Sequence, residues 1–289
     1  MPAVTSDTGL GTTYERIALA RLLEALASRY SIESVLEGPT DGITGIRGLN
    51  SIPLAQAGAS VELVLRDPDE LELARRVWKR LGLGDRLSTR VAQGERLSTR
   101  VAEGDRPDGD DRYDLVWNFN SIPQVERPGS LIAEMCRLSR DLVLVFTSNT
   151  WNYGFPLHRL HHRAAKEEWS HGNISMMNTR KISTLLSENG FRVVERLLAD
   201  VPWWPDIDSP IEEVAATFIP FLRGLSSGSK RLERYTWTAD DLPYFEPERR
   251  EPLEAELGRH FLIENARLFP LKALFAHHRG VLARREDAA

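Results

Sequence analysis

Residues 34–45 read SVLEGPTDGITG, a short apolar strand that ends in an acidic residue and enters a glycine-rich turn. Glycine permits positive φ angles and a close approach of the backbone to a ligand, and a helix that follows such a turn offers free N–H groups. This arrangement is typical of nucleotide-binding sites. The carboxylate of Glu37 suits an amine or a ribose hydroxyl and is a poor neighbour for a pyrophosphate. The stretch therefore disfavours NAD and P-loop sites, and neither G-x-x-x-x-G-K-[ST] nor an ungapped G-x-G-x-x-G is present.

Strands and helices alternate on both sides of this stretch. Helical periodicity marks residues 14–30, 52–57, 69–81, 130–138 and 179–188. Apolar segments of strand length lie at 61–65, 113–117, 142–146 and 191–198. The alternation predicts an α/β fold, a Rossmann-like, mostly parallel sheet with helices on both faces.

A tandem repeat interrupts the alternation. Residues 86–95 read RLSTRVAQGE and residues 96–105 read RLSTRVAEGD, so eight of ten positions are identical. A period of ten residues that occurs twice is too short for a solenoid, and we interpret it as a local duplication. Only one copy can form the third strand. We expect the second copy to do so, because it lies a short connection away from the strand at 113–117.

The pattern changes after Asp200. Eight prolines divide residues 202–270 into short helical pieces, none long enough to bury a core of its own. We therefore expect one domain, 1–289, with a Rossmann-like core at 1–200, a helical cap inserted at 201–274, and the last strand and tail at 275–289. The cap is rich in aromatic residues, and we expect Trp203, Trp204 or Trp237 to line an acceptor pocket or, alternatively, a homodimer surface.

Composition narrows the classes of function. Lys plus Arg is 37 and Asp plus Glu is 42, which gives a net charge of −5, and this balance makes a nucleic-acid partner unlikely. The single cysteine, Cys136, excludes an internal disulfide and a cysteine zinc cluster. No apolar run is long enough to span a membrane, and residues 1–12 lack the features of a signal peptide. We expect a cytoplasmic protein.

The order of these segments resembles that of the class I S-adenosylmethionine (SAM)-dependent methyltransferases. The resemblance covers roughly residues 14–198 and the last strand, and it rests on Val35-Leu-Glu37-Gly38 with Gly42, the strand at Val61, Glu103-Gly-Asp105 before Tyr113-Asp-Leu-Val116, and Asn189-Gly-Phe-Arg-Val-Val-Glu195. It implies a seven-stranded sheet whose last strand is antiparallel. It also implies SAM as cofactor and methyl transfer to a small or medium-sized acceptor.

The resemblance assigns roles to particular residues. Glu37 would lie near the methionyl end of SAM, with the backbone of Gly38, Thr40, Asp41 and Gly42 around it. Asp105 would lie near the adenine amine. Asn118 and Asn120 fall just past the fourth strand, where cofactor and acceptor meet.

The ribose position departs from the family pattern. The acidic residue that ordinarily binds both ribose hydroxyls should fall near Leu65. Asp67, two residues later, is the candidate to replace it. If Asp67 does not reach the ribose, the alternative is a non-catalytic nucleotide-binding or scaffold protein with the same fold. A dinucleotide-dependent oxidoreductase is a third alternative, disfavoured by Glu37.

Histidines cluster in the second half of the chain. His158 and His162 have the spacing of a metal pair on one helical face, but we favour a cationic, partly exposed helix, because no H-E-x-x-H is present. His171 or His161 is a candidate general base, since histidine titrates near neutrality. Adjacent His277 and His278 cannot both bind one ion from a regular strand. We expect no metal.

Overall fold

The strand that precedes the glycine turn, β2 (Ser34–Glu37), lies inside a seven-stranded sheet. The computed structural model describes residues 4–39, 45–92, 97, 113–165, 169, 172–204 and 234–286, without the side chains of 161 and 165. The strand order is β4 (Leu87–Val91), β3 (Ser60–Leu65), β2, β5 (Tyr113–Phe119), β6 (Ser139–Ser148), β9 (His278–Arg285), β7 (Phe191–Ala199). Strand β9 is antiparallel to both neighbours, and the other neighbouring strands are parallel. The predicted fold class is confirmed.

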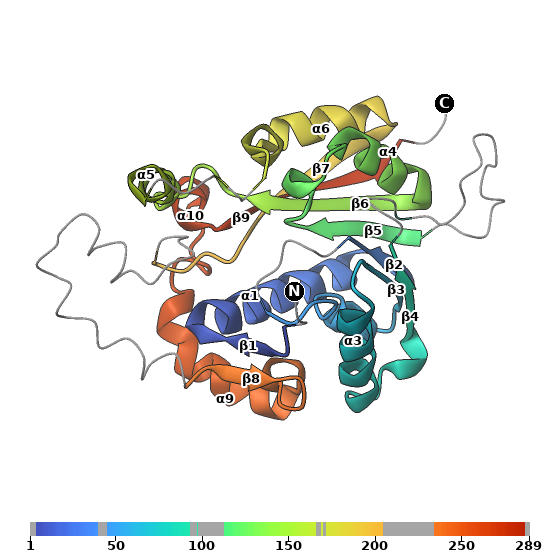
Figure 1. The fold of residues 1–289 in the computed structure, drawn as a ribbon, viewed down its shortest axis with the longest axis vertical. Helices are drawn as coiled ribbons and strands as arrows, with labels where there is room; N and C mark the ends of the chain where they lie inside the picture. Colours follow the sequence, from blue (N-terminus) through green and yellow to red (C-terminus); the bar gives the residue numbers. More distant parts are fainter. Residues whose placement is uncertain are drawn as a thin grey trace, which may run out of the picture.

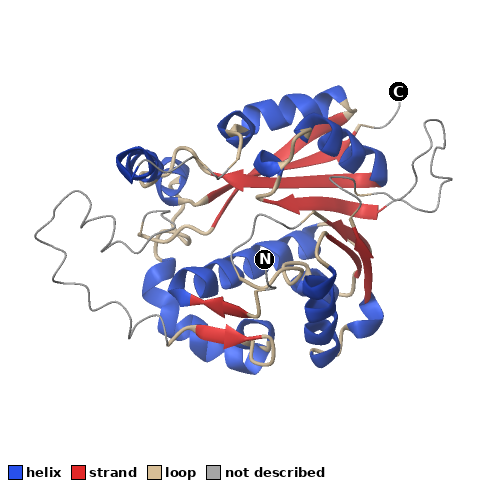
Figure 2. Cartoon of the chain, in the orientation of Figure 1, coloured by secondary structure: helices blue, strands red, loops and turns tan. Residues whose placement is uncertain are grey.

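Helices cover both faces of the sheet (Figures 1 and 2). One core contains residues of α1 (Gly9–Arg29), α2 (Ile52–Gln56) and α3 (Pro68–Arg80), and the other contains residues of α4 (Pro128–Leu138) and α6 (Thr179–Glu188). Neighbouring residues of one strand serve both cores: Val35 packs in the first and Leu36 in the second. Because both faces are buried, the central strands are continuously apolar rather than alternating.

The first repeat copy, not the second, forms the edge strand of the sheet. Strand β4 pairs in parallel with β3, from Val61 with Leu87 to Leu65 with Val91. Our expectation for the second copy was wrong. The physical reason is the connection from α3, which reaches β4 through the short 3₁₀ helix η1 (Gly84–Arg86). The longer connection falls after β4 instead. Of the second copy the structure describes Leu97, which is buried against Gly38 and the core around α4.

The segment before the last strand contains a short strand as well as helices. Strand β8 (Thr236–Thr238) pairs antiparallel with β1 (Ser6–Thr8), a pair that we did not predict. The elements that follow are η5 (Pro243–Phe245), α9 (Pro247–Leu257), η6 (Gly258–Phe261) and α10 (Phe269–Phe275). Since α10 runs to Phe275, the last strand begins at His278, three residues later than expected.

The remaining elements are two 3₁₀ helices and one α-helix that follow β5 or β6 along the chain: η2 (Ile122–Gln124), α5 (Phe155–Ala165) and η3 (Ile174–Met177). Within the described ranges, no helix is both long enough and apolar enough to cross a bilayer.

Candidate functional site

The carboxyl ends of β2, β3, β5 and β6 meet at one edge of the sheet. In open α/β sheets, ligands bind outside this edge, where the strand order reverses beside the first strand. Here β2 is that strand, with β3 on one side and β5 on the other. The sequence-predicted residues Glu37, Asn118 and Asn120 all lie at this edge.

Glu37 is the last residue of β2, and it is completely buried. Its Oε2 accepts hydrogen bonds from the Ser51 backbone N–H (3.1 Å) and hydroxyl (2.5 Å). Its Oε1 has no hydrogen-bond partner within the described part of the chain. Burial, opposed by the Ser51 hydrogen bonds, raises the pKa of the carboxyl to about 7. One carboxylate oxygen is therefore hydrogen-bonded to Ser51, and the other has no hydrogen-bond partner in the described part of the chain.

The turn after Glu37 is held by side chains from the end of β5. A Cβ on Gly38 would lie 2.8 Å from Cβ of Val64 and 2.9 Å from its carbonyl oxygen, so only glycine fits. Nδ2 of the buried Asn118 donates to the carbonyls of Gly38 (3.0 Å) and Pro39 (2.8 Å). The Ser121 hydroxyl also donates to the Pro39 carbonyl, at 2.7 Å. Asn118 thus positions the start of the turn.

Asn120 joins the ends of β5 and β6. It adopts a positive φ of 55°, and its Oδ1 accepts from the Ser148 backbone N–H (2.8 Å) and hydroxyl (2.9 Å). Asn is one of the few residues other than glycine that adopt this left-handed conformation. Its side chain is used to hold the strand ends in register.

The position at which the resemblance implies a ribose-binding carboxylate is apolar. Leu65 is completely buried. Asp67 caps α3, and its Oδ1 accepts from the Asp69 backbone N–H at 2.8 Å. Thr40, Asp41, Gly42, Asp105 and His171 lie outside the described residues. His161 lies in α5, and its side chain is not described.

A second polar cluster, which we did not predict, lies at the same edge beyond β6, β7 and β9. It contains Glu15 of α1, Asp200 directly after β7, and His278, the first residue of β9. Asp200 resembles Glu37 in being a polar residue at the carboxyl end of a strand, whereas His278 is the first residue of its strand. Glu15 has no such position at a strand end, because it lies within a helix far away in the sequence.

Two further carboxyl and hydroxyl groups border this cluster. Oε2 of Glu264 accepts from the Tyr14 hydroxyl (3.1 Å) and the Val201 backbone N–H (2.8 Å). Burial, with the neighbouring Asp200 charge, raises the pKa of Glu264. These two donors come from α1 and from the segment after β7, which are far apart in the sequence.

The histidine pair of α5 has the geometry that its spacing predicted. The Nε2 atoms of His158 and His162 are 3.0 Å apart, and the two rings are stacked. Trp169 packs against both rings, with centroids 5.6 and 5.5 Å away. In Figure 1, α5 lies beyond the carboxyl end of β6, away from β2.

The tryptophans of the cap pack mainly on α1. Trp204 meets Tyr14 edge to face at 5.4 Å, and the Trp237 indole N–H donates to the Thr13 hydroxyl at 2.9 Å. Trp203 is 54% exposed. Their role in an acceptor pocket stays a prediction.

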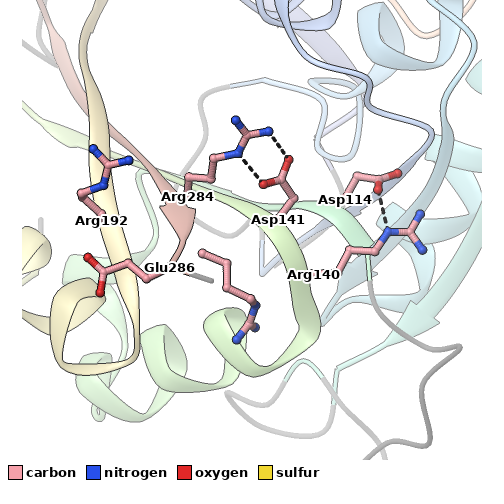
Figure 3. A pocket seen from close by; sticks show the side chains of 7 residues that line it. Asp114, Arg140, Asp141, Arg192, Arg284 and Glu286 are labelled. Carbon is pink, nitrogen blue, oxygen red and sulfur yellow. Dashed lines mark hydrogen bonds and ion pairs between the residues drawn. The ribbon is translucent and has the colours of Figure 1, made fainter. Parts of the chain in front are cut away.

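A charged pocket of about 710 Å³ lies at the opposite, amino-terminal edge of the parallel strands (Figure 3). It is lined by Asp114, Arg140, Asp141, Arg192, Arg284, Arg285 and Glu286. Its charges pair with one another: Arg140 with Asp114 at 2.6 Å and Arg284 with Asp141 at 2.7 Å. Because it lies at the wrong edge and its charges are largely compensated, we do not take it as the functional site.

Comparisons with known proteins agree with this fold. No protein-family model matches the sequence, and no curated protein is similar to it at a significant level. Among solved structures, the MccD protein has 12% identity and a TM-score of 0.50, with 93% of this chain and 96% of that chain covered. The complex of the Haloferax volcanii Trm112 methyltransferase activator with a putative methyltransferase gives 17% identity, coverage of 96% and 94%, and a TM-score of 0.49. The magnesium protoporphyrin IX methyltransferase of Synechocystis PCC 6803 with bound SAH has 16% identity and a TM-score of 0.48, with 68% of this chain and 80% of that chain covered.

Similarity at this level of identity concerns the fold alone. A seven-stranded sheet with an antiparallel last strand is what the resemblance to class I SAM-dependent methyltransferases implied. That resemblance is therefore confirmed for the fold.

Proposed function

We propose that this chain binds SAM and transfers its methyl group to a small or medium-sized acceptor. The observation that carries the proposal is the buried Glu37 carboxylate at the carboxyl end of β2, with an oxygen that lacks a partner in the described structure. An uncommitted buried carboxylate oxygen is costly unless a donor reaches it, and the ammonium group of SAM is such a donor. The ligand edge of the sheet is the place where this donor would arrive.

SAM supplies an electrophilic methyl group, and the residues of this chain position it. Glu37 holds the amino-acid end, and the Gly38 turn, with Thr40, Asp41 and Gly42, lies along it. Asn118 orients the turn through the Gly38 and Pro39 carbonyls. Asp105 is proposed for the adenine amine and Asp67 for the ribose. Such catalysis consists mainly of alignment in a dry pocket.

The acceptor is proposed to lie beyond the ends of β5 and β6. Asn120 borders this place, and His171 or His161 is proposed to take a proton from the acceptor. Transfer to oxygen or nitrogen often needs such a base, and histidine titrates in the right range. The net charge of −5 supports a small-molecule acceptor rather than a nucleic acid.

A non-catalytic protein of this fold is the second candidate. Leu65 is completely buried at the ribose position, and Asp67 is engaged in capping α3. If Asp67 keeps its hydrogen bond to the Asp69 backbone N–H, its carboxylate does not bind the ribose hydroxyls. Weak or absent binding of SAM would follow.

Titration calorimetry with SAM, S-adenosylhomocysteine and NAD tests the proposal. We expect both sulfur nucleosides to bind and NAD not to bind. Glu37→Gln should weaken SAM binding about tenfold, because a charge-assisted hydrogen bond becomes a neutral one. Glu62→Gln is the matched control, since Glu62 lies on the neighbouring strand and bonds Arg90 and Tyr113 instead.

The outcomes separate the candidates. Unchanged SAM affinity in Glu37→Gln would remove Glu37 from the cofactor site. Failure of SAM and S-adenosylhomocysteine to bind the wild-type chain would favour the non-catalytic protein. Binding of NAD alone would favour an oxidoreductase.

A further inference from the structure

We propose that Glu15, Asp200 and His278 form a binding site for a divalent transition-metal ion. Each side chain offers one donor atom, and the three atoms lie within 4.8 Å of one another. Donor atoms bound to one ion at about 2.1 Å are at most about 4.2 Å apart, so the three side chains would move slightly closer together when an ion binds. The proposal departs from the sequence-based expectation that the chain holds no metal, and it involves none of the residues proposed to bind SAM.

The backbone fixes two of the three ligands. His278 pairs with Ala199 of β7 and with Ser148 of β6, so it sits where three strands meet. The His277 backbone N–H donates to the Asp200 carbonyl at 2.8 Å, which holds Asp200 beside the start of β9. Glu15 comes from α1, and its Oε2 lies 3.8 Å from Nε2 of His278.

The Asp200 side chain gives an independent indication that a cation binds here. Its side chain is 5% exposed, and Oδ1 is buried with no hydrogen-bond partner in the described part of the chain. A buried carboxylate oxygen without a partner carries an uncompensated desolvation cost. A bound cation would remove this cost.

The other oxygen of Asp200 is held in a way that is common around metal sites. Oδ2 lies 2.7 Å from Nδ1 of His277, and Nε2 of His277 lies 3.1 Å from the Trp204 carbonyl oxygen. Outer groups of this kind orient a metal-binding carboxylate, and their loss typically weakens metal binding by about 10- to 100-fold. His277 is therefore a positioning residue, and its role agrees with the expectation that adjacent histidines do not bind one ion.

The surrounding charge also favours a cation. Three carboxyl groups, those of Glu15, Asp200 and Glu264, gather here, and the basic groups beside them are His277, His278 and Lys272. A divalent ion would compensate such a concentration of acidic groups.

The donor set selects the class of ion. Two carboxylate oxygens and one imidazole nitrogen suit Mn²⁺, Fe²⁺ or Zn²⁺, and three protein ligands leave positions open for water or a substrate. Soft ions such as Cu⁺ are disfavoured, because no thiolate takes part. The Phe119 ring, 4.7 Å from the His278 ring, forms an apolar wall beside the cluster.

Metal binding is measured with the full-length chain after chelator treatment. Mn²⁺ is titrated by electron paramagnetic resonance and Co²⁺ by visible absorption. We expect about one ion per chain with micromolar affinity, and a rise in the thermal midpoint on saturation. Glu15→Gln and His278→Gln should each weaken binding at least tenfold.

Two control variants match these changes. Glu24→Gln alters another glutamate of α1, which bonds Arg250, and His260→Gln alters another buried histidine, which bonds Trp203. Both should retain wild-type affinity within about twofold. Far- and near-ultraviolet circular dichroism of each variant shows whether it is folded before metal is added.

The proposal is overturned if the folded wild-type chain binds neither ion at 1 mM, on the order of the weakest specific affinities. It is also overturned if Glu15→Gln and His278→Gln bind as tightly as the two controls. In that case the ion occupies another site, for which the His158 and His162 pair is the candidate. SAM binding by these variants should be unchanged, which separates failure here from failure of the proposed methyl transfer.

Discussion

At the scale of single residues, Glu37 makes folding stability depend on pH. Its pKa lies near 7 in the folded chain and at the ordinary 4.5 when unfolded, because burial favours the neutral form. The unfolded state therefore loses its proton at lower pH. The stabilisation by neutral Glu37 is complete below pH 4.5 and is lost as pH rises through about 7, with a total change of about 3 kcal/mol.

Glu37→Gln should abolish this contribution. The amide keeps an oxygen for Ser51 and carries no charge at any pH. The test is urea unfolding without cofactor at pH 5 and pH 8. The free energy of unfolding of the variant minus that of wild type should be about 2–3 kcal/mol larger at pH 8 than at pH 5. A constant difference between variant and wild type would mean that Glu37 is charged in the folded chain.

Much of the proposed cofactor edge could be predicted from the sequence, because its residues lie at strand ends. Glu37, Asn118 and Asn120 each lie at the end of an apolar run. Strands β2 and β5, which carry Glu37 and Asn118, are neighbours in the sheet although two strands separate them along the chain. Their side-chain partners could not be predicted. Ser51 meets Glu37 only after a turn and a helix start are built, and Glu15 meets His278 across the whole length of the chain.

At the scale of elements, four of the five predicted helices end within two residues of their predicted limits, whereas α1 begins at Gly9, five residues before its predicted start. The shortest strands were not predicted. Helix α6 (Thr179–Glu188) coincides with its predicted range, since its caps and apolar face are both explicit. The three-residue strands β1 and β8 are too short to show alternation. The repeat was ambiguous for another reason: two nearly identical copies have the same local propensity, and only the connection from α3 selects between them.

The repeat offers a matched pair of substitutions. The Ala92 backbone N–H donates to the Leu65 carbonyl at 2.7 Å, and the two-residue period of a parallel ladder makes Arg90 a donor too. Arg90→Pro should cost about 2 kcal/mol, because it removes that donor and the ion pair with Glu62.

Arg100→Pro is the control, since Arg100 occupies the same position in the second copy. We expect a smaller loss, because the place beside β3 is taken by the first copy. Both losses are measured by urea unfolding. Equal losses would contradict a unique role for the first copy.

At the scale of the whole molecule, one buried ion pair joins β1, α1 and η5 to the turn that follows the glycine-rich stretch. Asp7 of β1 and Arg16 of α1 are 0% and 3% exposed, with Oδ2 and Nε 2.8 Å apart. Oδ1 of Asp7 also accepts from the Ile46 backbone N–H at 2.6 Å, and Oδ2 accepts from the Tyr244 hydroxyl of η5. Arg16 in turn donates to the Ile46 carbonyl and to Asn50.

This arrangement explains why the amino-terminal strand, although only three residues long, is part of the fold. A Cβ on Gly45 would lie 2.2 Å from Oδ1 of Asp7, so the turn approaches the carboxylate as closely as glycine allows. The Arg16 charge also favours ionised Glu37. The pair thus links the packing of β1 and η5 to the electrostatics of the proposed cofactor site.

Asp7→Asn should be among the most destabilising substitutions in the chain. It leaves the Arg16 guanidinium buried without a counter-charge, which costs about 3–5 kcal/mol. Tyr244→Phe removes one hydrogen bond from the same carboxylate and keeps the charge pair, so it should cost about 1 kcal/mol. Urea unfolding followed by tryptophan fluorescence compares the two, with equal denaturant slopes as evidence of unchanged folded and unfolded states. If Asp7→Asn costs no more than Tyr244→Phe, the network acts as ordinary hydrogen bonds, and its charge does not hold β1 and η5 to the turn.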